Sequence, residues 1–285
     1  MKGWRIYNHC WMPTCADRGT PDLSSIKTGE IWKEGGLLAQ WISDFDCEEE
    51  TGWWHVIKSE PFEITSLKSS YRRQARKGAE YFRVEELQPG EFEEESRLIL
   101  EAARDTYNIP KRPNGVHSRR TEAKDESATI RHRFGAFDRE SGKLCAVSGV
   151  IEDVIGKCIG YSSHKALPSE ERRYVNAALV SGVLDYYKGK LSCGWYLDDG
   201  ARSVLHETNF QIYLIKYFGF RKAYCKMHLV VNPKIRFAVG LLFRLRALVR
   251  LLKKLSNAYL LKQIDGVMTM MEVSEERKYG WRLSE

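Results

Sequence analysis

Polar side chains that can exchange protons follow the apolar run at residues 195–197. Asp198 and Asp199 come directly after this run and are followed by a glycine. Because side chains alternate along a strand, only one of the two carboxylates should face a cleft. We choose Asp199, which is nearer to the turn, as a candidate base or as an anchor for an amine. The alternative is that both aspartates only end the strand with turn chemistry.

A second group of candidates follows the aspartates. His206 titrates near neutrality, so it is a candidate base, or a ligand for a carboxylate or phosphate when charged. A capping or packing histidine is the commoner case. Arg202 is a candidate anion clamp at the mouth of the next helix. Asn209 and Tyr213 are candidate substrate-binding residues, although the run from Glu207 to Asn209 is equally suited to satisfying the backbone of the turn.

The elements that position these residues are predicted from the stretch 195–231. A strand ends at the turn, Ser203 or Thr208 caps a helix, and Gly219 ends that helix. The run Phe220–Val231 then alternates and is rich in strand-forming residues. A strand that ends in a polar turn before a helix is where open α/β folds place ligands. The stretch therefore predicts a cleft at this turn.

The chain before residue 80 is β-rich and contains a polar loop at 13–30. A helix is predicted from Ser66 to about Gly78, and its basic face is either a plain solvated surface or an anion-binding one. The basic residues of this helix are Arg72, Arg73, Arg76 and Lys77. The predicted strands are Trp4–Cys10, Leu37–Asp44 and Trp53–Ile57.

From residue 80 onward the predicted order is strand, helix, helix, three strands, helix, strand, helix, strand. This order is neither a plain doubly wound alternation nor an all-β series. A basic loop at 108–120 separates the first two helices. Before residue 195 the strands are Tyr81–Leu87, Phe134–Phe137, Leu144–Ile151 and Cys158–Ser163, and the helices are Glu91–Tyr107, Thr121–Arg133 and about Arg172–Lys188.

This order over residues 80–231 resembles the GNAT acyltransferase superfamily. The most specific local feature is Leu214–Phe220, similar to the helix end at which that superfamily uses a Gly-Phe pair, here Gly219-Phe220, to enter its final strand. The entry segment together with residues 69–87 resembles the Fem-type branch, which includes peptidoglycan aminoacyltransferases. The resemblance implies an α+β or α/β fold with a mixed, strongly twisted sheet flanked by helices.

The same resemblance implies transfer of an acyl or aminoacyl group to an amine. The implied donor is an acyl-CoA or an aminoacyl-tRNA, and the implied acceptor is an envelope precursor or glycan. Two positions depart from the CoA-binding members. Their glycine-rich phosphate loop corresponds here to 164–173, which has no glycine but offers Lys165, Arg172 and Arg173 as candidate cofactor-binding cations. Their general-acid tyrosine corresponds to Ile215.

The charge and the cysteine content of the chain limit the classes of partner that we expect. The chain has 285 residues and a net charge of +7, and from Lys216 to Lys254 every charged side chain is basic. Such a block favours anionic lipid, nucleic acid or a phosphorylated substrate as a neighbour, and tRNA phosphates are one example; DNA is not expected. Seven scattered cysteines indicate reduced thiols rather than disulfides. The spacing of His9, Cys10 and Cys15 matches no metal-ligand pattern, so no metal is expected.

The segment 235–255 is predicted to be a basic amphipathic helix. Leucines and one phenylalanine fall on one side and Lys or Arg on the other, and there are too many charges for a membrane span. The pattern is typical of a helix that lies in an anionic membrane surface. The alternative, which the pattern does not separate from the first, is that the leucines pack on the protein's own core.

These observations lead to three predicted regions and two functional hypotheses. The regions are a β-rich segment with a basic helix (1–79), a GNAT-like domain (80–232), and a basic helix with a tail (233–285). The first hypothesis is an acyl or aminoacyl transferase of bacterial cell-envelope or polysaccharide metabolism. The second is an inactive GNAT-like module that binds a glycan or membrane partner. We expect a cytoplasmic location, with attachment to the inner membrane face if the helix binds lipid.

Overall fold

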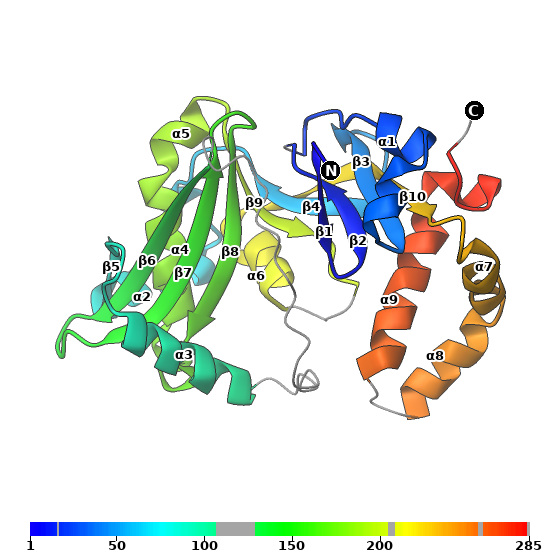
Figure 1. Cartoon of the computed structure of the whole chain (residues 1–285). Helices are drawn as coiled ribbons and strands as arrows, with labels where there is room; N and C mark the ends of the chain where they lie inside the picture. Colours follow the sequence, from blue (N-terminus) through cyan, green and yellow to red (C-terminus); the bar gives the residue numbers. More distant parts are fainter. Residues whose placement is uncertain (16, 107–128, 205–208, 256–258, 284–285) are drawn as a thin grey trace.

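The computed structural model describes the whole chain except residues 16, 107–128, 205–208, 256–258 and 284–285. The described residues form one mixed, twisted sheet with the strand order β1-β2-β3-β10-β4-β9-β8-β7-β6-β5 (Figure 1). The strands are β1 Trp4–Tyr7, β2 Cys10–Pro13, β3 Leu38–Cys47, β4 Trp53–Lys58, β5 Phe82–Glu86, β6 Thr129–Asp138, β7 Leu144–Asp153, β8 Cys158–Ala166, β9 Tyr196–Ala201 and β10 Arg221–Val231.

Helices flank this sheet, which confirms the predicted fold class. The α-helices are α1 Ser24–Lys27, α2 Ser69–Tyr81, α3 Glu93–Thr106, α4 Val175–Tyr186, α5 Lys188–Ser192, α6 Asn209–Phe218, α7 Arg236–Arg244, α8 Arg246–Leu255 and α9 Tyr259–Val273. Short 3₁₀ turns are η1 Glu30–Glu34, η2 Ile64–Ser66, η4 Pro168–Arg173 and η5 Glu275–Tyr279. The seven cysteines all carry free thiols.

Strands β5 to β9 form one continuous part of the sheet. Strands β5, β6, β7 and β8 pair antiparallel in chain order, and β8 then pairs parallel with β9. The parallel register runs only from Cys158 opposite Tyr196 to Gly160 opposite Asp198. Beyond Gly160 no further pairing of β8 with β9 occurs among the described residues, so the two strands part at this point.

Strand β4 lies between β9 and β10, and it is the main departure from a simple chain-order sheet. It pairs antiparallel with β9 on one side and with β10 on the other. Strand β10 in turn pairs with β3, so the segment 38–58 is built into the same sheet as the strands after residue 80. The predicted division of the chain at residues 79 and 232 stays a prediction.

The two faces of the sheet are covered differently. Helices α2, α4 and α6 share one hydrophobic core on one face, to which β4 contributes Val56 and β9 contributes Leu197. Helix α3 packs through Ile99 on Val147, on the opposite face (Figure 1). Because side chains alternate along a strand, residues next to Val56 and Leu197 point away from the α4 side. This alternation positions the candidate site described below.

The structure corrects several predicted element boundaries. Asp198, Asp199 and Gly200 lie inside β9 rather than in a turn after it. Residues 129–133 begin strand β6, so the predicted helix to Arg133 is wrong there, and its earlier part falls outside the described residues. The predicted strand Trp4–Cys10 is a hairpin of β1 and β2. The turn at Gly219 has a φ of +69°, and the predicted helix-to-strand change is confirmed.

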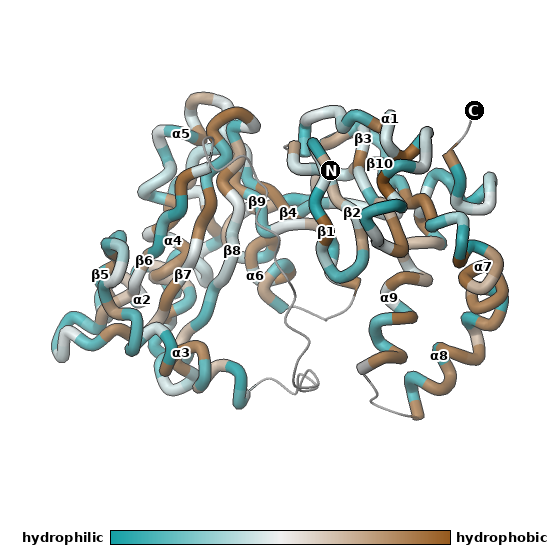
Figure 2. Tube along the Cα trace, in the orientation of Figure 1, coloured by the Kyte–Doolittle hydropathy of each residue, from teal (hydrophilic) through white to brown (hydrophobic). Residues whose placement is uncertain are grey.

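The C-terminal segment is a group of helices rather than one helix and a tail. The predicted helix 235–255 breaks at Leu245 into α7 and α8, and α8 packs against α9. Phe243, Val249 and Met271 join these helices to β10 in a second hydrophobic core. Figure 2 shows hydrophobic residues along α7 and α8. Among the described residues no helix is both long and apolar enough to cross a bilayer.

Candidate functional site

A pocket of about 500 Å³ opens on the face of the sheet opposite α4, where β8 and β9 part. It is bordered by strands β1, β2, β3, β4, β6, β7, β8 and β9 and by the segment that follows β2. The charged side chains in its lining are Arg5, Asp17, His55, Arg131, Asp153 and Asp198. The aromatic lining residues are Trp41, Trp53 and Tyr161, and the indole N–H of Trp53 has no hydrogen-bond partner among the described residues.

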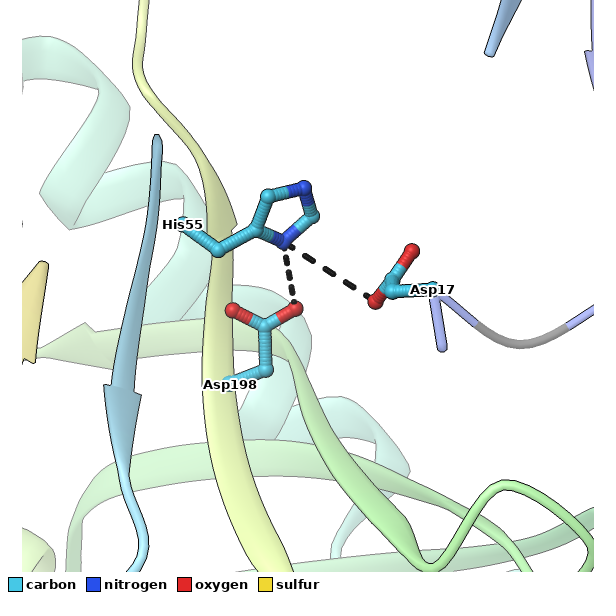
Figure 3. A group of neighbouring side chains, drawn as sticks. All are labelled: Asp17, His55 and Asp198. Atoms are coloured by element: carbon cyan, nitrogen blue, oxygen red, sulfur yellow. Dashed lines mark hydrogen bonds and ion pairs between the residues drawn. The ribbon is translucent and has the colours of Figure 1, made fainter. Parts of the chain in front are cut away.

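The innermost polar group of the pocket is a hydrogen-bonded pair of His55 on β4 and Asp198 on β9. Nδ1 of His55 lies 3.0 Å from Oδ2 of Asp198, and both side chains are more than nine-tenths buried (Figure 3). The other carboxylate oxygen of Asp198 accepts from the backbone N–H of Gly200 at 2.8 Å. We call this pair the His55–Asp198 dyad. Nε2 of His55 points away from both neighbouring carboxylates, as Figure 3 shows, and bonds to no described residue.

The strand geometry explains why these two side chains meet. Ile57 pairs with Asp198 whereas His55 pairs with Ala201, so β9 has one more residue than β4 over this interval. This bulge includes Gly200, whose φ of +90° suits glycine far better than any other residue. Bulges re-aim side chains and are frequent beside active sites. Phe45 packs edge-on against His55 and helps to fix its ring.

Asp17 brings a second carboxylate to the dyad from the segment after β2. Its Oδ2 lies 3.9 Å from Nδ1 of His55. The neighbouring Arg18 anchors the segment, because its guanidinium lies 4.3 Å from the ring centroid of Tyr196. The ligand atoms of Asp17, His55 and Asp198 lie within 4.8 Å of one another, a spacing that could hold a metal ion. A metal would have to bind the lone pair of Nδ1. When Nδ1 donates its hydrogen bond to Asp198, it carries a proton in that position and has no lone pair for a metal.

The surroundings of His55 favour its charged form. Burial lowers the pKa of the imidazole, but the charge of Asp198, the hydrogen bond to it and the charge of Asp17 outweigh burial and raise the pKa to about 9. At neutral pH the ring is therefore an imidazolium whose Nε2–H is available to the pocket. The dyad can donate a hydrogen bond and a proton to an oxygen placed there.

Asp199, the carboxylate chosen from the sequence, points away from the dyad. Successive side chains of β9 face opposite ways, so Asp198 lines the pocket and Asp199 does not. Burial and the charge of Asp198 raise the pKa of Asp199 to about 7, while Gln211 on α6 and Lys165 on β8 oppose the shift. A carboxyl group with that pKa can act as a base near neutrality, so its predicted role stays a prediction.

The other candidates from the 195–213 region are dispersed. Arg202 stacks on Trp54 at 4.5 Å from the ring centroid and donates to the backbone oxygen of Gly52 at 2.6 Å. Asn209 is the exposed first residue of α6. Tyr213 is half-buried in an aromatic row with Tyr217. His206 lies outside the described residues. None of the described candidates lines the pocket.

The three predicted cofactor-binding cations are also separated. Lys165 lies on β8, where burial lowers the pKa of its amine. Arg173 pairs with Asp138 at 2.6 Å and with Glu170 at 2.9 Å, and it lies over the ring of Tyr81. Arg172 is exposed in the 3₁₀ turn η4.

The N-terminus of α4, where the resemblance implied a phosphate loop, packs closely against helix α2. Val175 and Ala177 in its first turn are almost fully buried. A Cβ built on Gly78 of α2 would lie 2.8 Å from the backbone oxygen of Tyr174 and 3.0 Å from the backbone nitrogen of Ala178. Helix α2 therefore fills the space at this helix end.

Sequence reasoning missed His55 and Asp17. His55 is the one polar residue in the strand-like run Trp53–Ile57, so it was visible as an exception to an apolar pattern. Its partner could not be inferred, because the pairing of β4 with β9 joins positions far apart in the chain. Asp17 lies in the polar loop and had no distinguishing neighbour.

No family model and no curated protein matches this chain. The C-terminal domain of a putative lysylphosphatidylglycerol synthetase from Agrobacterium fabrum has a TM-score of 0.49 at 10% identity, covering 80% of this chain and 79% of that chain. L-PGS from Bacillus licheniformis has a TM-score of 0.47 at 11% identity, covering 87% of this chain and 85% of that chain. A tandem GNAT protein of the clavulanic acid biosynthesis pathway has a TM-score of 0.39 at 11% identity, covering 70% of this chain and 66% of that chain. The similarity concerns chain arrangement alone, and the Fem-type branch stays a prediction.

Proposed function

We propose that this protein is a GNAT-like transferase that moves an acyl or aminoacyl group to an amine acceptor, with the His55–Asp198 dyad handling the protons. The observation that carries the proposal is the buried dyad at the floor of a pocket of about 500 Å³, at the point where β8 and β9 part. Cell-envelope metabolism as the setting is part of the proposal.

In the proposed reaction, His55 moves one proton from the acceptor amine to the leaving group. The acceptor nitrogen attacks the donor carbonyl, and the Nε2–H of charged His55 donates to the oxygen that becomes negative. As the bond from carbonyl carbon to leaving group breaks, His55 gives its proton to the leaving group. The neutral imidazole then takes the surplus proton from the new amide nitrogen. Asp198 keeps the ring oriented and stabilises its charged form throughout.

The pocket favours a polar, charged acyl group. Its lining includes the carboxylates of Asp17 and Asp153 and the guanidinium groups of Arg5 and Arg131. Carboxylates suit the ammonium group of an aminoacyl ester, and arginines suit a phosphate or carboxylate nearby. The covered N-terminus of α4 argues against binding CoA in the manner of the CoA-dependent relatives. An aminoacyl-tRNA is therefore the donor that we favour over an acyl-CoA.

Helix α2 carries a second basic surface, on the face of the sheet opposite the pocket, where only distant phosphates of a large donor such as a tRNA would reach it. Its side chains Arg73, Arg76 and Lys77 are exposed, and together with Arg72 they border a shallow groove of about 340 Å³. Arginine and lysine at such a surface contact phosphates without regard to sequence. Of the two predictions made for the basic face of this helix, we propose the anion-binding one.

Donor binding and transfer test the proposal separately. The full chain is titrated calorimetrically with acetyl-CoA and with a set of charged and uncharged tRNAs, and transfer from any bound donor to amine acceptors is followed with a radiolabelled acyl group. We expect binding of charged tRNA, weak or no binding of acetyl-CoA, and a loss of transfer of at least about 100-fold in His55→Gln. Tight acetyl-CoA binding would contradict the donor assignment, and full activity of His55→Gln would contradict the role of the dyad.

One observation favours the second candidate function, a binding module without catalysis. The position of the family's general-acid tyrosine is Ile215 on α6, a partly buried residue packed against the core. In the proposed mechanism His55 takes over this function. If no donor supports transfer while a glycan or envelope precursor binds with full affinity to His55→Gln, the module is the correct function.

A further inference from the structure

Helix α8 presents most of its charged and apolar side chains the opposite way round from an ordinary surface helix, and α7 continues its exposed apolar surface. The apolar stripe of such a helix normally faces the core and its charges face water. In α8 the charges face protein. Arg250 donates to Asp265 at 3.0 Å and to Glu272 at 2.8 Å, and Lys253 pairs with Asp265 at 2.5 Å. Arg246 pairs with Glu272 at 3.1 Å, so three cations of α8 are used to attach it to α9.

The apolar side chains are consequently left in solvent. The most exposed are Phe237 at 88% and Leu255 at 77%, and the rest lie between 38% and 54%. Winding α8 at 100° per residue puts its exposed leucines on the side opposite Arg246, Arg250 and Lys253. Clusters of this kind on one face mark an interaction site rather than scattered surface hydrophobics. The exposed members are Phe237, Leu241, Leu242, Leu245, Leu248, Leu251, Leu252 and Leu255; we call them the leucine face.

The charge around the leucine face selects the occupant. Lys234, Arg244 and Lys254 are exposed, and none of them forms an ion pair with a described residue. From Lys216 to Lys254 the sequence has eleven Lys or Arg residues and no Asp or Glu. A second copy of this chain would bring the same cations together, and like charges repel. An anionic bilayer matches the exposed leucines with its apolar interior and the exposed cations with its charged headgroups.

We propose that the leucine face inserts into the interfacial layer of an anionic bilayer, with Lys234, Arg244 and Lys254 at the level of the headgroups. Helix α7 and helix α8 lie along the membrane plane, since neither is long enough to cross it. Helix α9 and its carboxylates form the platform that holds α8 with its leucines outward. The inference does not depend on the proposed transfer reaction.

Flotation of the full chain with vesicles tests the proposal directly. Vesicles of phosphatidylglycerol and phosphatidylcholine are compared with vesicles of phosphatidylcholine alone, at low and at high salt. We expect binding only to the anionic vesicles and a loss of binding of at least about tenfold as salt rises, because exposed charges are screened. Equal binding to neutral vesicles, or no binding to either kind, would overturn the proposal.

Matched variants separate insertion from general stickiness. Leu248→Gln with Leu252→Gln should reduce binding to anionic vesicles at least about tenfold, because both side chains are exposed leucines of the face. The control pair is Leu98→Gln with Ile155→Gln, which are at least as exposed but lie on α3 and between β7 and β8, and it should bind like the parent. Arg244→Gln with Lys254→Gln should bind more weakly and depend less on salt.

The oligomeric state decides between lipid and a second copy. Sedimentation equilibrium of the parent without lipid should give a monomer, and circular dichroism should show that the leucine variants keep the fold. A dimer that dissociates in Leu248→Gln with Leu252→Gln, or vesicle binding that those substitutions leave unchanged, would overturn the assignment to a membrane.

Discussion

Asp198 and Asp199 are neighbours in the chain, yet they have different surroundings. Asp198 bonds to His55 at the floor of the pocket, whereas Asp199 lies near Gln211 and Lys165. The sequence indicated that only one of the two would face a cleft, and it could not indicate which. The choice depends on the register of β9 against β4, which is fixed by a pairing partner almost 150 positions earlier in the chain.

The first prediction concerns the titration of His55. Its pKa of about 9 depends on Asp198, so Asp198→Asn should lower the pKa to 6.5 or below, where burial dominates. Because the folded pKa is raised, the stability that His55 contributes is present below the unfolded pKa and is lost as pH rises through about 9. NMR titration of the imidazole measures this pKa in the parent and in the variant, and urea unfolding at a series of pH values measures the change in stability. An unchanged His55 pKa in Asp198→Asn would show that the dyad is not the source of the shift.

The second prediction concerns Asp199→Asn. Because the pKa of Asp199 is raised to about 7, its carboxylate destabilises the fold above neutrality, and the amide should increase the melting temperature at pH 8 by about 2 °C or more. The increase should vanish at pH 4, where the parent side chain is protonated. If Asp199 is also the base for the acceptor amine, transfer falls by about 100-fold or more. Retained transfer would exclude it from the site.

At the scale of elements, helices with clear patterns were predicted well and strand partners were not. The run 214–220 was correctly predicted to end a helix at Gly219 and enter a strand, since a left-handed glycine has few other uses there. The helix 235–255 was predicted as one piece because its pattern is continuous, whereas the structure divides it at Leu245 and packs α8 on α9. Which face of α8 meets the protein was likewise invisible, because the acidic partners lie on another helix.

The third prediction tests the contact that closes the N-terminus of α4. Gly78→Ala adds a methyl group 2.8 Å from the backbone oxygen of Tyr174, so α2 must shift and the free energy of unfolding should fall by about 1–3 kcal/mol. Gly189→Ala on α5 is the control, because a Cβ there meets nothing within 4 Å and alanine favours a helix. Chemical denaturation measures both. Equal stability of Gly78→Ala and the parent would mean that α2 does not seal this helix end.

At the scale of the whole molecule, one sheet links the pocket to the C-terminal helices. The predicted mixed sheet with flanking helices is confirmed, whereas the position of β4 between β9 and β10 was not foreseen. His228 of β10 stacks on Trp41 of the pocket lining and bonds to Glu276 of η5 at 2.7 Å. The same carboxyl group accepts from the backbone N–H of Leu229 at 2.8 Å. Glu276 therefore ties the end of the chain to the middle of the sheet.

The fourth prediction concerns this tie. Burial raises the pKa of Glu276, but the bonds from His228 and Leu229 outweigh it, so the pKa is lowered. A lowered pKa means that the stabilisation is present above the unfolded pKa and is lost as pH falls through the folded one. Glu276→Gln should cost about 1–3 kcal/mol at pH 7 and progressively less below pH 4. Urea unfolding at both pH values measures the difference, and a cost that is independent of pH would contradict the assignment.

The central position of β4 has a consequence for how the protein is made on the ribosome. The partners of β4 are β9 and β10, so the hydrophobic strand Trp53–Lys58 leaves the ribosome long before either partner exists. At ordinary elongation rates, synthesis of residues 59–195 takes on the order of ten seconds. During that interval the nascent chain carries a mostly apolar strand without its sheet partners, and such exposed strands are prone to aggregate. The sheet can be completed only after β10 has left the ribosome.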